Sequence, residues 1–198
     1  RLQRGGCEIS LKGEQQLRGR PVNRMALQTL LHVLYLGLTY SGSALSNRDP
    51  STELLNVRRI LGSGAYDHAL ACAVSSLEVR SGNTDLYDLI IESAQYASRL
   101  TEVDSILRNR IYEGKDVPHA LYARGLVSLK RGDWVQALKM FGDALDFGLN
   151  VPSLHGAQEY AYEKAHGVEK AVDHYLALSH REPNNPGVWY SLALAYWS

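Results

Sequence analysis

The chain has 198 residues, and 45% of them are hydrophobic, which is enough to build the core of at least one domain. There are 21 basic and 21 acidic side chains, so the net charge is zero. This composition excludes an intrinsically disordered chain. It also argues against nucleic acid as the main partner, because phosphate binding needs a clustered basic surface.

The N-terminal segment has the charge pattern of a targeting sequence. Residues 1–24 carry six Lys or Arg side chains against two Glu, and an apolar run, MALQTLLHVLYLGLTYSGSAL, follows at 25–45. Small residues follow this run and lead into a polar stretch, and Ala44 and Ser46 could occupy the two positions before a cleavage site that require small residues. This order is typical of a secretory signal peptide. We therefore predict a basic segment with a signal peptide at 1–46, the peptide itself being Met25–Ser46, and a periplasmic, secreted or envelope-associated protein.

Two other interpretations of the apolar run stay open. Some 20 apolar residues are long enough to anchor the chain in a bilayer, and this anchor would be the only contact with a membrane. The run could instead form an amphipathic helix that covers one end of a helical array. In that case the protein would be cytoplasmic.

A period of 34 residues organises the rest of the chain. Steps of 34 back from Pro186 reach Pro152, Pro118, Thr84 and Pro50 without any insertion. Proline suits the first turn of a helix, where its missing N–H has no helical partner. The predicted domain is an array at 50–198, with full repeats at 50–83, 84–117, 118–151 and 152–185 and a partial repeat at 186–198.

Each repeat contains the pattern of two helices separated by a turn. Glycine-containing turns are predicted at 63–65, 131–133 and 165–167, because glycine ends a helix at little cost. Later in each full repeat, two positions four residues apart fall on one helical face. The first is mostly small, which lets two helices approach closely, and the second is mostly large and apolar. The small positions are Ala69, Val103, Ala137 and Ala171, and the large ones are Ala73, Leu107, Phe141 and Tyr175.

The third repeat, with Trp134, Ala137 and Phe141, and the partial fifth, with Trp189 and Tyr196, carry the strongest motifs. They resemble the tetratricopeptide repeat family, whose signature is W-x2-L-G-x2-Y followed by A-x3-F. The resemblance implies an all-α fold, a right-handed superhelical solenoid of tandem helix–turn–helix repeats, behind the N-terminal apolar segment. The first helices of the repeats would line a concave groove.

The second repeat departs from the family pattern at three positions. Ile91 fills a position that is usually small, Asp104 replaces an apolar residue, and Arg110 replaces an alanine. The assignment of this repeat depends on the unbroken period more than on its residues.

The resemblance implies that the groove-facing residues come from the first helix of each repeat. Tyrosine suits peptide recognition, because it offers a large contact area with a polar tip. We expect a non-catalytic scaffold that binds a protein or peptide segment in the groove, although several of these side chains could merely pack against a neighbouring helix. The candidate residues are Arg58, Asp88, Glu92, Tyr96, Tyr122, Leu126, Lys130, Tyr160 and Lys164.

No motif predicts catalysis, a cofactor or a metal site. The sequence LGSGAY at 61–66 resembles a kinase glycine-rich loop but lacks the third glycine and the other kinase motifs. The Arg-Gly-Asp tripeptide at 131–133, like this loop, falls at a predicted turn. Cys7 and Cys72 form neither a disulfide framework nor a zinc motif. Four histidines of the fourth repeat have no metal-binding spacing on one helix, and they are His155, His166, His174 and His180.

Two alternatives to a free-standing scaffold remain. The array could be the regulatory or substrate-recruiting arm of a larger enzyme whose catalytic domain lies beyond residue 198, because the sequence stops inside a repeat. It could also self-associate through an exposed end, where Trp189, Tyr190, Tyr196 and Trp197 are expected to lie uncovered.

Overall fold

The computed structural model describes residues 50–198, and every regular element in this range is an α-helix. The prediction of an all-α fold is confirmed for this part of the chain. The basic segment at 1–46 and its candidate signal peptide lie outside the described residues. None of the described helices combines the length and the apolar character that crossing a bilayer requires.

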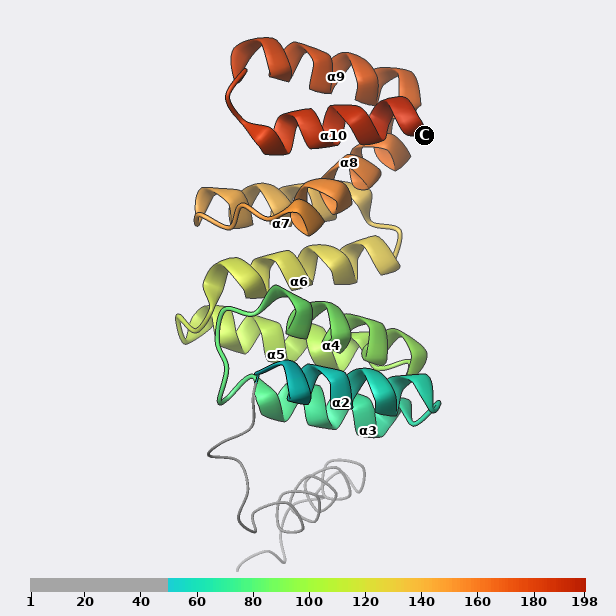
Figure 1. The fold of residues 1–198 in the computed structure, drawn as a ribbon, viewed down its shortest axis with the longest axis vertical. Helices are drawn as coiled ribbons and strands as arrows, with labels where there is room; N and C mark the ends of the chain where they lie inside the picture. Colours follow the sequence, from blue (N-terminus) through green and yellow to red (C-terminus); the bar gives the residue numbers. More distant parts are fainter. Residues whose placement is uncertain (1–49) are drawn as a thin grey trace, which may run out of the picture. The chain divides into compact units, whose positions relative to one another are not determined.

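The helices are stacked as successive pairs, α2 with α3, α4 with α5, α6 with α7 and α8 with α9, and α10 follows the last pair (Figure 1). The second helices begin at Tyr66, Leu100, Trp134 and Val168, so their starts recur every 34 residues. The helices are α2 Pro50–Gly62, α3 Tyr66–Ser76, α4 Thr84–Tyr96, α5 Leu100–Tyr112, α6 Val117–Lys130, α7 Trp134–Asp146, α8 Pro152–His166, α9 Val168–Arg181 and α10 Pro186–Trp197.

The turns inside the pairs use left-handed backbone conformations. Gly64 and Gly132 have φ values of 81° and 76°, so both the kinase-like loop and the Arg-Gly-Asp tripeptide lie at helix–helix turns. Ser98 takes the same place in the turn between α4 and α5, with a φ of 58°. In the fourth pair, α8 continues to His166 and only Gly167 separates it from α9. The turn predicted at 165–167 is therefore shorter than expected.

Side-chain caps and prolines fix where several helices begin. The Asn83 side chain accepts a hydrogen bond from the backbone N–H of Leu86, and Asp133 accepts one from Gln136. Such caps satisfy N–H groups that have no partner within the helix. The helix predicted to begin at Pro118 begins one residue earlier, with the proline still in its first turn.

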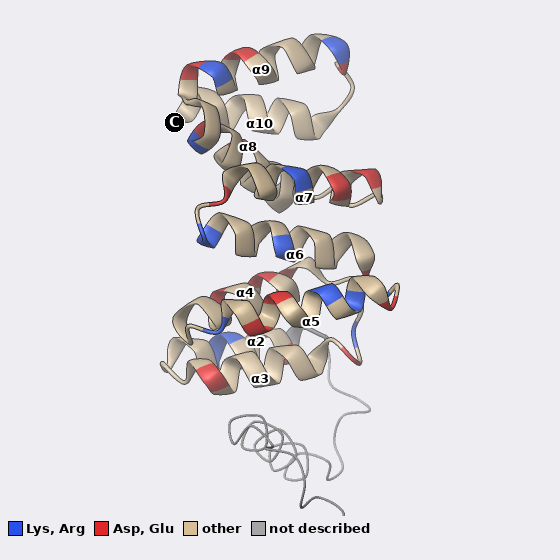
Figure 2. Cartoon of the chain, turned by 180° about the vertical axis from the view of Figure 1, so that it is seen from behind, with Lys and Arg blue, Asp and Glu red and all other residues tan. Residues whose placement is uncertain are grey.

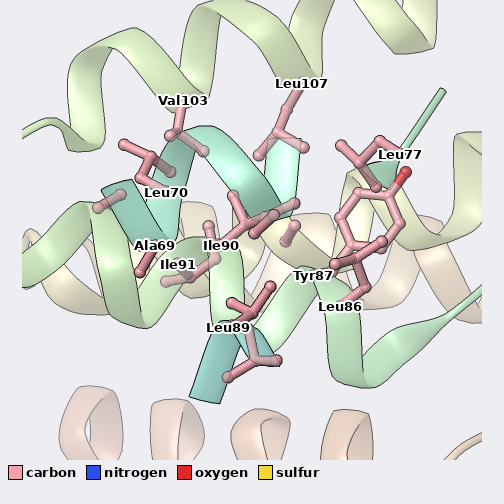
Figure 3. Close-up of a cluster of buried hydrophobic side chains, with 14 of the residues drawn as sticks. Ala69, Leu70, Leu77, Leu86, Tyr87, Leu89, Ile90, Ile91, Val103 and Leu107 are labelled. Carbon is pink, nitrogen blue, oxygen red and sulfur yellow. The ribbon is translucent and has the colours of Figure 1, made fainter. Parts of the chain in front are cut away.

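Helix α4 lies at the centre of the first core, where seven of its 13 residues are buried. Leu86, Leu89 and Ile90 of α4 belong to a cluster that also contains Leu70 of α3 and Leu107 of α5 (Figure 3). A second cluster joins α6, α7 and α8, and a third joins α9 and α10. The burial of apolar area stabilises each pair only together with its neighbours.

The two positions that the sequence predicts on one face of the second helices are buried in all four pairs. Around Phe141 the packing is close, because a Cβ added at Gly125 of α6 would overlap its ring. In the second pair the equivalent residues are Ile91 and Leu107, both in the first core. In the second pair, Ile91 is larger than Gly125, and Leu107 on the facing helix is smaller than Phe141.

Asp104 and Arg110, which depart from the repeat pattern, are both buried, and each forms ion pairs. Asp104 accepts hydrogen bonds from Arg108 at 2.7 Å and from Arg124 of α6 at 3.0 Å. Arg110 contacts Glu78 at 3.1 Å and Asp116 at 3.5 Å. Burial by itself raises the pKa of Asp104, but the two arginines outweigh it and hold this pKa below its ordinary value. Both residues thus connect α5 to neighbouring pairs.

Candidate functional site

The first helix of each pair contacts the first helix of the next pair, from α2 through α4, α6 and α8 to α10. Within residues 50–198, the backbones of the second helices α3, α5, α7 and α9 lie close only to first helices and not to one another. The first helices therefore form a continuous row, called the first-helix row below. All nine candidate residues belong to this row.

At the α2–α4 end of the row the candidate residues are charged. Arg58 and Glu92 are exposed, whereas Asp88 is half-buried. Burial raises the pKa of Asp88, the hydrogen bond from Tyr122 opposes this, and repulsion from Asp85 adds to it. This end of the row is polar, with Arg58 and Glu92 available to solvent.

Tyr122 of α6 is a packing residue, which differs from its expected role as a groove contact. Only 2% of it is exposed, and its ring lies 6.0 Å from that of Phe141. Its hydroxyl donates a hydrogen bond of 2.8 Å to Asp88. Burial raises the pKa of this hydroxyl, so it remains a donor at neutral pH. A partner has almost no access to this side chain.

Tyr96, at the end of α4, is open to a partner. It is 56% exposed, and its ring stacks on that of Tyr66, the first residue of α3, with a centroid distance of 5.0 Å and an interplanar angle of 22°. Stacking holds both rings in a defined orientation while one face stays in water. The two stacked tyrosines together form a partly exposed aromatic surface at the turn end of the first two pairs.

A second aromatic surface is built around Tyr160 of α8. Tyr160 is 46% exposed, the Lys164 Nζ lies 5.0 Å from its ring centroid, and the Trp134 ring meets it edge-on at 6.2 Å. Lys164 also donates a hydrogen bond of 2.8 Å to the carboxylate of Glu163, and this bond raises the pKa of the lysine. The site thus offers an oriented aromatic ring beside a cation.

The remaining candidates, Leu126 and Lys130, divide between core and surface. Leu126 is partly buried and packs against both the first and the second hydrophobic clusters. Lys130 is exposed at the last residue of α6. Among the described residues it has no ion-pair partner, so its ammonium group is free to contact a ligand.

Tyr66 and Trp134 belong to these aromatic surfaces, although neither is among the nine candidate residues. Each is the first residue of a second helix, and each lies against the first helix of the next pair. The two aromatic residues occupy the same position in their repeats, and the 34-residue period could have identified them for this reason.

Two histidines of the fourth pair, His166 and His174, pack around the ring of Tyr162. The rings of His166 and His174 lie 4.5 and 4.3 Å from that of Tyr162. Burial lowers the pKa of His174, and repulsion from His166 and Arg181 adds to the effect. No group of three or more His, Cys, Asp or Glu residues at 50–198 is arranged to hold a metal ion.

An open cleft of about 490 Å³ lies away from the first-helix candidates, between the loop before α8 and the loop before α10. Its lining is mainly polar and includes Asn150, Arg181 and Asn184. Cys72 is half-buried and packs against the first hydrophobic cluster, and burial raises the pKa of its thiol. Neither feature touches the aromatic surfaces.

The aromatic surfaces at Tyr66–Tyr96 and at Trp134–Tyr160–Lys164 each join side chains of the first-helix row to the first residue of a second helix, and they are best suited to contact a partner. In comparisons with known proteins, no family model matches the chain, and no curated protein matches it.

Proposed function

We propose that residues 50–198 form a solenoid of the tetratricopeptide type that binds a protein or peptide segment along its first-helix row. The helix starts at intervals of 34 residues support the repeat assignment. The backbones of successive first helices lie close together, whereas those of the second helices at 50–198 do not, which supports an array that bends toward the first-helix row. A bent array of this kind presents a concave surface to an extended partner.

The cluster of Tyr160, Lys164 and Trp134 carries this proposal. Aromatic and cationic side chains supply much of the binding energy of protein interfaces when they are partly preorganised. Trp134 orients the Tyr160 ring, and Lys164 lies over it, so little side-chain entropy remains to be lost on binding. Tyr66 and Tyr96 provide a second anchor at the α3–α4 boundary.

The chain is expected to act by holding a partner, and its aromatic anchors would select segments with exposed apolar or aromatic side chains. Lys130 lies at the last residue of α6, the first helix between α4 and α8. Its ammonium group would favour partners that carry an acidic residue between two apolar ones.

To obtain a probe for this function, the full chain is immobilised, and peptides that bind it are selected from a phage-displayed library of random sequences. The affinity of a synthetic, fluorescein-labelled copy of the selected peptide is then measured by fluorescence anisotropy. Tyr160→Ala and Lys164→Ala are each expected to weaken binding by about 10-fold, equivalent to about 1.4 kcal/mol. Tyr112→Ala is the matched control, because Tyr112 is 93% exposed on the second helix α5. Equal affinities of wild type and Tyr160→Ala, or failure to select any peptide, would contradict the proposal.

A further inference from the structure

Three arginine side chains converge on one carboxylate where α5 packs against α6. The Nε of Arg124 donates a hydrogen bond of 3.0 Å to Oδ1 of Asp104, and Arg108 donates one of 2.7 Å to Oδ2. Arg131, in the turn after α6, lies 3.6 Å from the same Oδ2. These three arginines and Asp104 are called the arginine cluster below.

The arginine cluster carries more positive charge than its carboxylate can balance. Three arginines and one aspartate leave a net charge of +2, and among residues 50–198 no other carboxylate forms an ion pair with these arginines. The charges of Lys130 and Asp133, on either side of the turn after α6, cancel each other. Arg110, also on α5, differs because two carboxylates, those of Glu78 and Asp116, lie beside it. Figure 2 shows the imbalance on α6, which has blue segments and no red ones.

Most N–H groups of the cluster remain available to a ligand. A guanidinium group has five N–H donors in a planar fork. Each arginine contacts Asp104 through one nitrogen, and Arg131 also donates a hydrogen bond of 3.3 Å to the hydroxyl of Thr101. The side chains of Arg108 and Arg131 are 62% and 40% exposed. Because both reach the same oxygen of Asp104, their guanidinium groups lie side by side at the surface.

We propose that the arginine cluster binds a phosphate group with two negative charges, held between Arg108 and Arg131 with Arg124 beside them. Such a group is carried by a phosphorylated protein side chain or by a free phosphate ester. The site contains none of the residues of the two aromatic surfaces, so the proposal does not rest on peptide binding along the first-helix row.

Charge and geometry both favour phosphate over a single carboxylate. A phosphate monoester carries nearly two negative charges at pH 7, which match the surplus charge of the cluster, and its three acceptor oxygens can bridge two guanidinium groups. Arginine forks bind phosphate oxygens in pairs. The side chain of Asp104 is only 10% exposed and holds all three arginines, so their like charges are already gathered before a ligand arrives.

The test is an NMR titration of the ¹⁵N-labelled full chain at about 150 mM salt, which screens non-specific attraction. The three probes are a glycine pentapeptide with a central phosphoserine, the same peptide with glutamate in place of phosphoserine, and inorganic phosphate. The amide signals around Thr101, Ser105 and Arg131 are expected to shift saturably with the phosphopeptide, with a Kd of about 1 mM or lower. The glutamate peptide, which offers one charge in place of two, should bind at least about 10-fold more weakly.

Variants of the two exposed arginines locate the binding. Arg108→Gln and Arg131→Gln are each expected to weaken phosphopeptide binding by at least about 5-fold. Arg108→Lys keeps the charge without the planar fork and should recover part of the affinity. Arg59→Gln, at an exposed arginine of α2, is the matched control and should bind like wild type. Circular dichroism checks that each variant is folded.

The outcomes decide both the site and the source of the phosphate. Equal affinities of wild type and of folded Arg108→Gln and Arg131→Gln would place phosphate binding elsewhere and overturn the proposal. Equal binding of the phosphoserine and glutamate peptides, or no saturable binding of any probe, would also overturn it. If the phosphopeptide binds more tightly than inorganic phosphate, the ligand is a phosphorylated protein segment, and equal or weaker binding identifies a free phosphate ester.

Discussion

The hydroxyl of Tyr122 donates a hydrogen bond of 2.8 Å to Asp88, the residue 34 positions earlier in the chain. The two residues occupy the same position in successive first helices, α4 and α6. The bond satisfies a half-buried carboxylate and ties one pair of helices to the next. It also explains why a tyrosine at a position expected to line a groove is 2% exposed.

Replacing Tyr122 should change stability rather than partner binding. Tyr122→Phe removes one hydrogen bond and is expected to lower the free energy of unfolding by about 1 kcal/mol. Tyr122→Ala also removes the buried ring, and a loss of about 3–5 kcal/mol is expected. Urea unfolding followed by circular dichroism measures both. Tyr160→Phe, at an exposed ring, is the control, and a Tyr122→Ala protein as stable as wild type would show that Tyr122 is not a core residue.

The close approach of Gly125 and Phe141 predicts a specific coupling between the two positions. Gly125→Ala should destabilise the protein by about 1–3 kcal/mol, because the added Cβ overlaps the Phe141 ring. Phe141→Leu alone leaves a cavity, yet combined with Gly125→Ala it should recover part of the loss. Ile91 and Leu107 already form such a pairing in the preceding repeat. A double-mutant cycle in thermal unfolding would measure the coupling, and strictly additive effects would argue against the contact.

Ser98 is strained where the equivalent turns have glycine. Its φ of 58° is left-handed, as are the values for Gly64 and Gly132. Ser98→Gly is therefore expected to raise the free energy of unfolding by about 0.5–1 kcal/mol. Ser105→Gly, in the exposed middle of α5, should instead lower it by about 1 kcal/mol. Chemical denaturation of both variants checks the prediction, which fails if Ser98→Gly is the less stable of the two.

Glu159 should make the stability of the C-terminal helices depend on pH. It is 3% exposed, its Oε1 has no hydrogen-bond partner among the described residues, and burial raises its pKa above the ordinary 4.5, with Glu163 adding repulsion. A raised pKa means that the folded state holds the proton more tightly. The resulting stability is complete below pH 4.5 and is lost as the pH rises through the folded-state pKa.

Glu159→Gln cannot ionise, so it should be more stable than wild type at pH 7 by on the order of 1 kcal/mol. The difference should shrink toward pH 4. Melting temperatures across this pH range, with exposed Glu92→Gln as the control, give the measurement. A difference between variant and wild type that is the same at every pH would rule out titration of Glu159 as its cause.

The regular features of the helices were predictable from the sequence, because they repeat. The starts of α3, α5, α7 and α9 follow the 34-residue period, and the small and apolar positions of each repeat are buried. Turns at Gly64 and Gly132 followed from glycine chemistry alone. These features depend on neighbours within one or two helices, which a local pattern encodes.

Features that depend on contacts between repeats were harder to predict. Periodicity places Tyr122 on a face of its helix but does not show that Phe141 and Asp88 cover it. Asp104 looks like a defect in the pattern until Arg124, 20 residues later, is seen to pair with it. Trp134 was not among the candidate site residues, because the packing of α7 against α8 that brings it to Tyr160 is a contact between repeats.

An NMR footprint of the selected peptide on the ¹⁵N-labelled full chain tests the central claim most directly. Peptide binding along the first-helix row predicts that the perturbed amides cluster on α4, α6 and α8, around Tyr96, Lys130 and Tyr160. A footprint confined to the solvent-facing sides of α3, α5, α7 and α9 would contradict it.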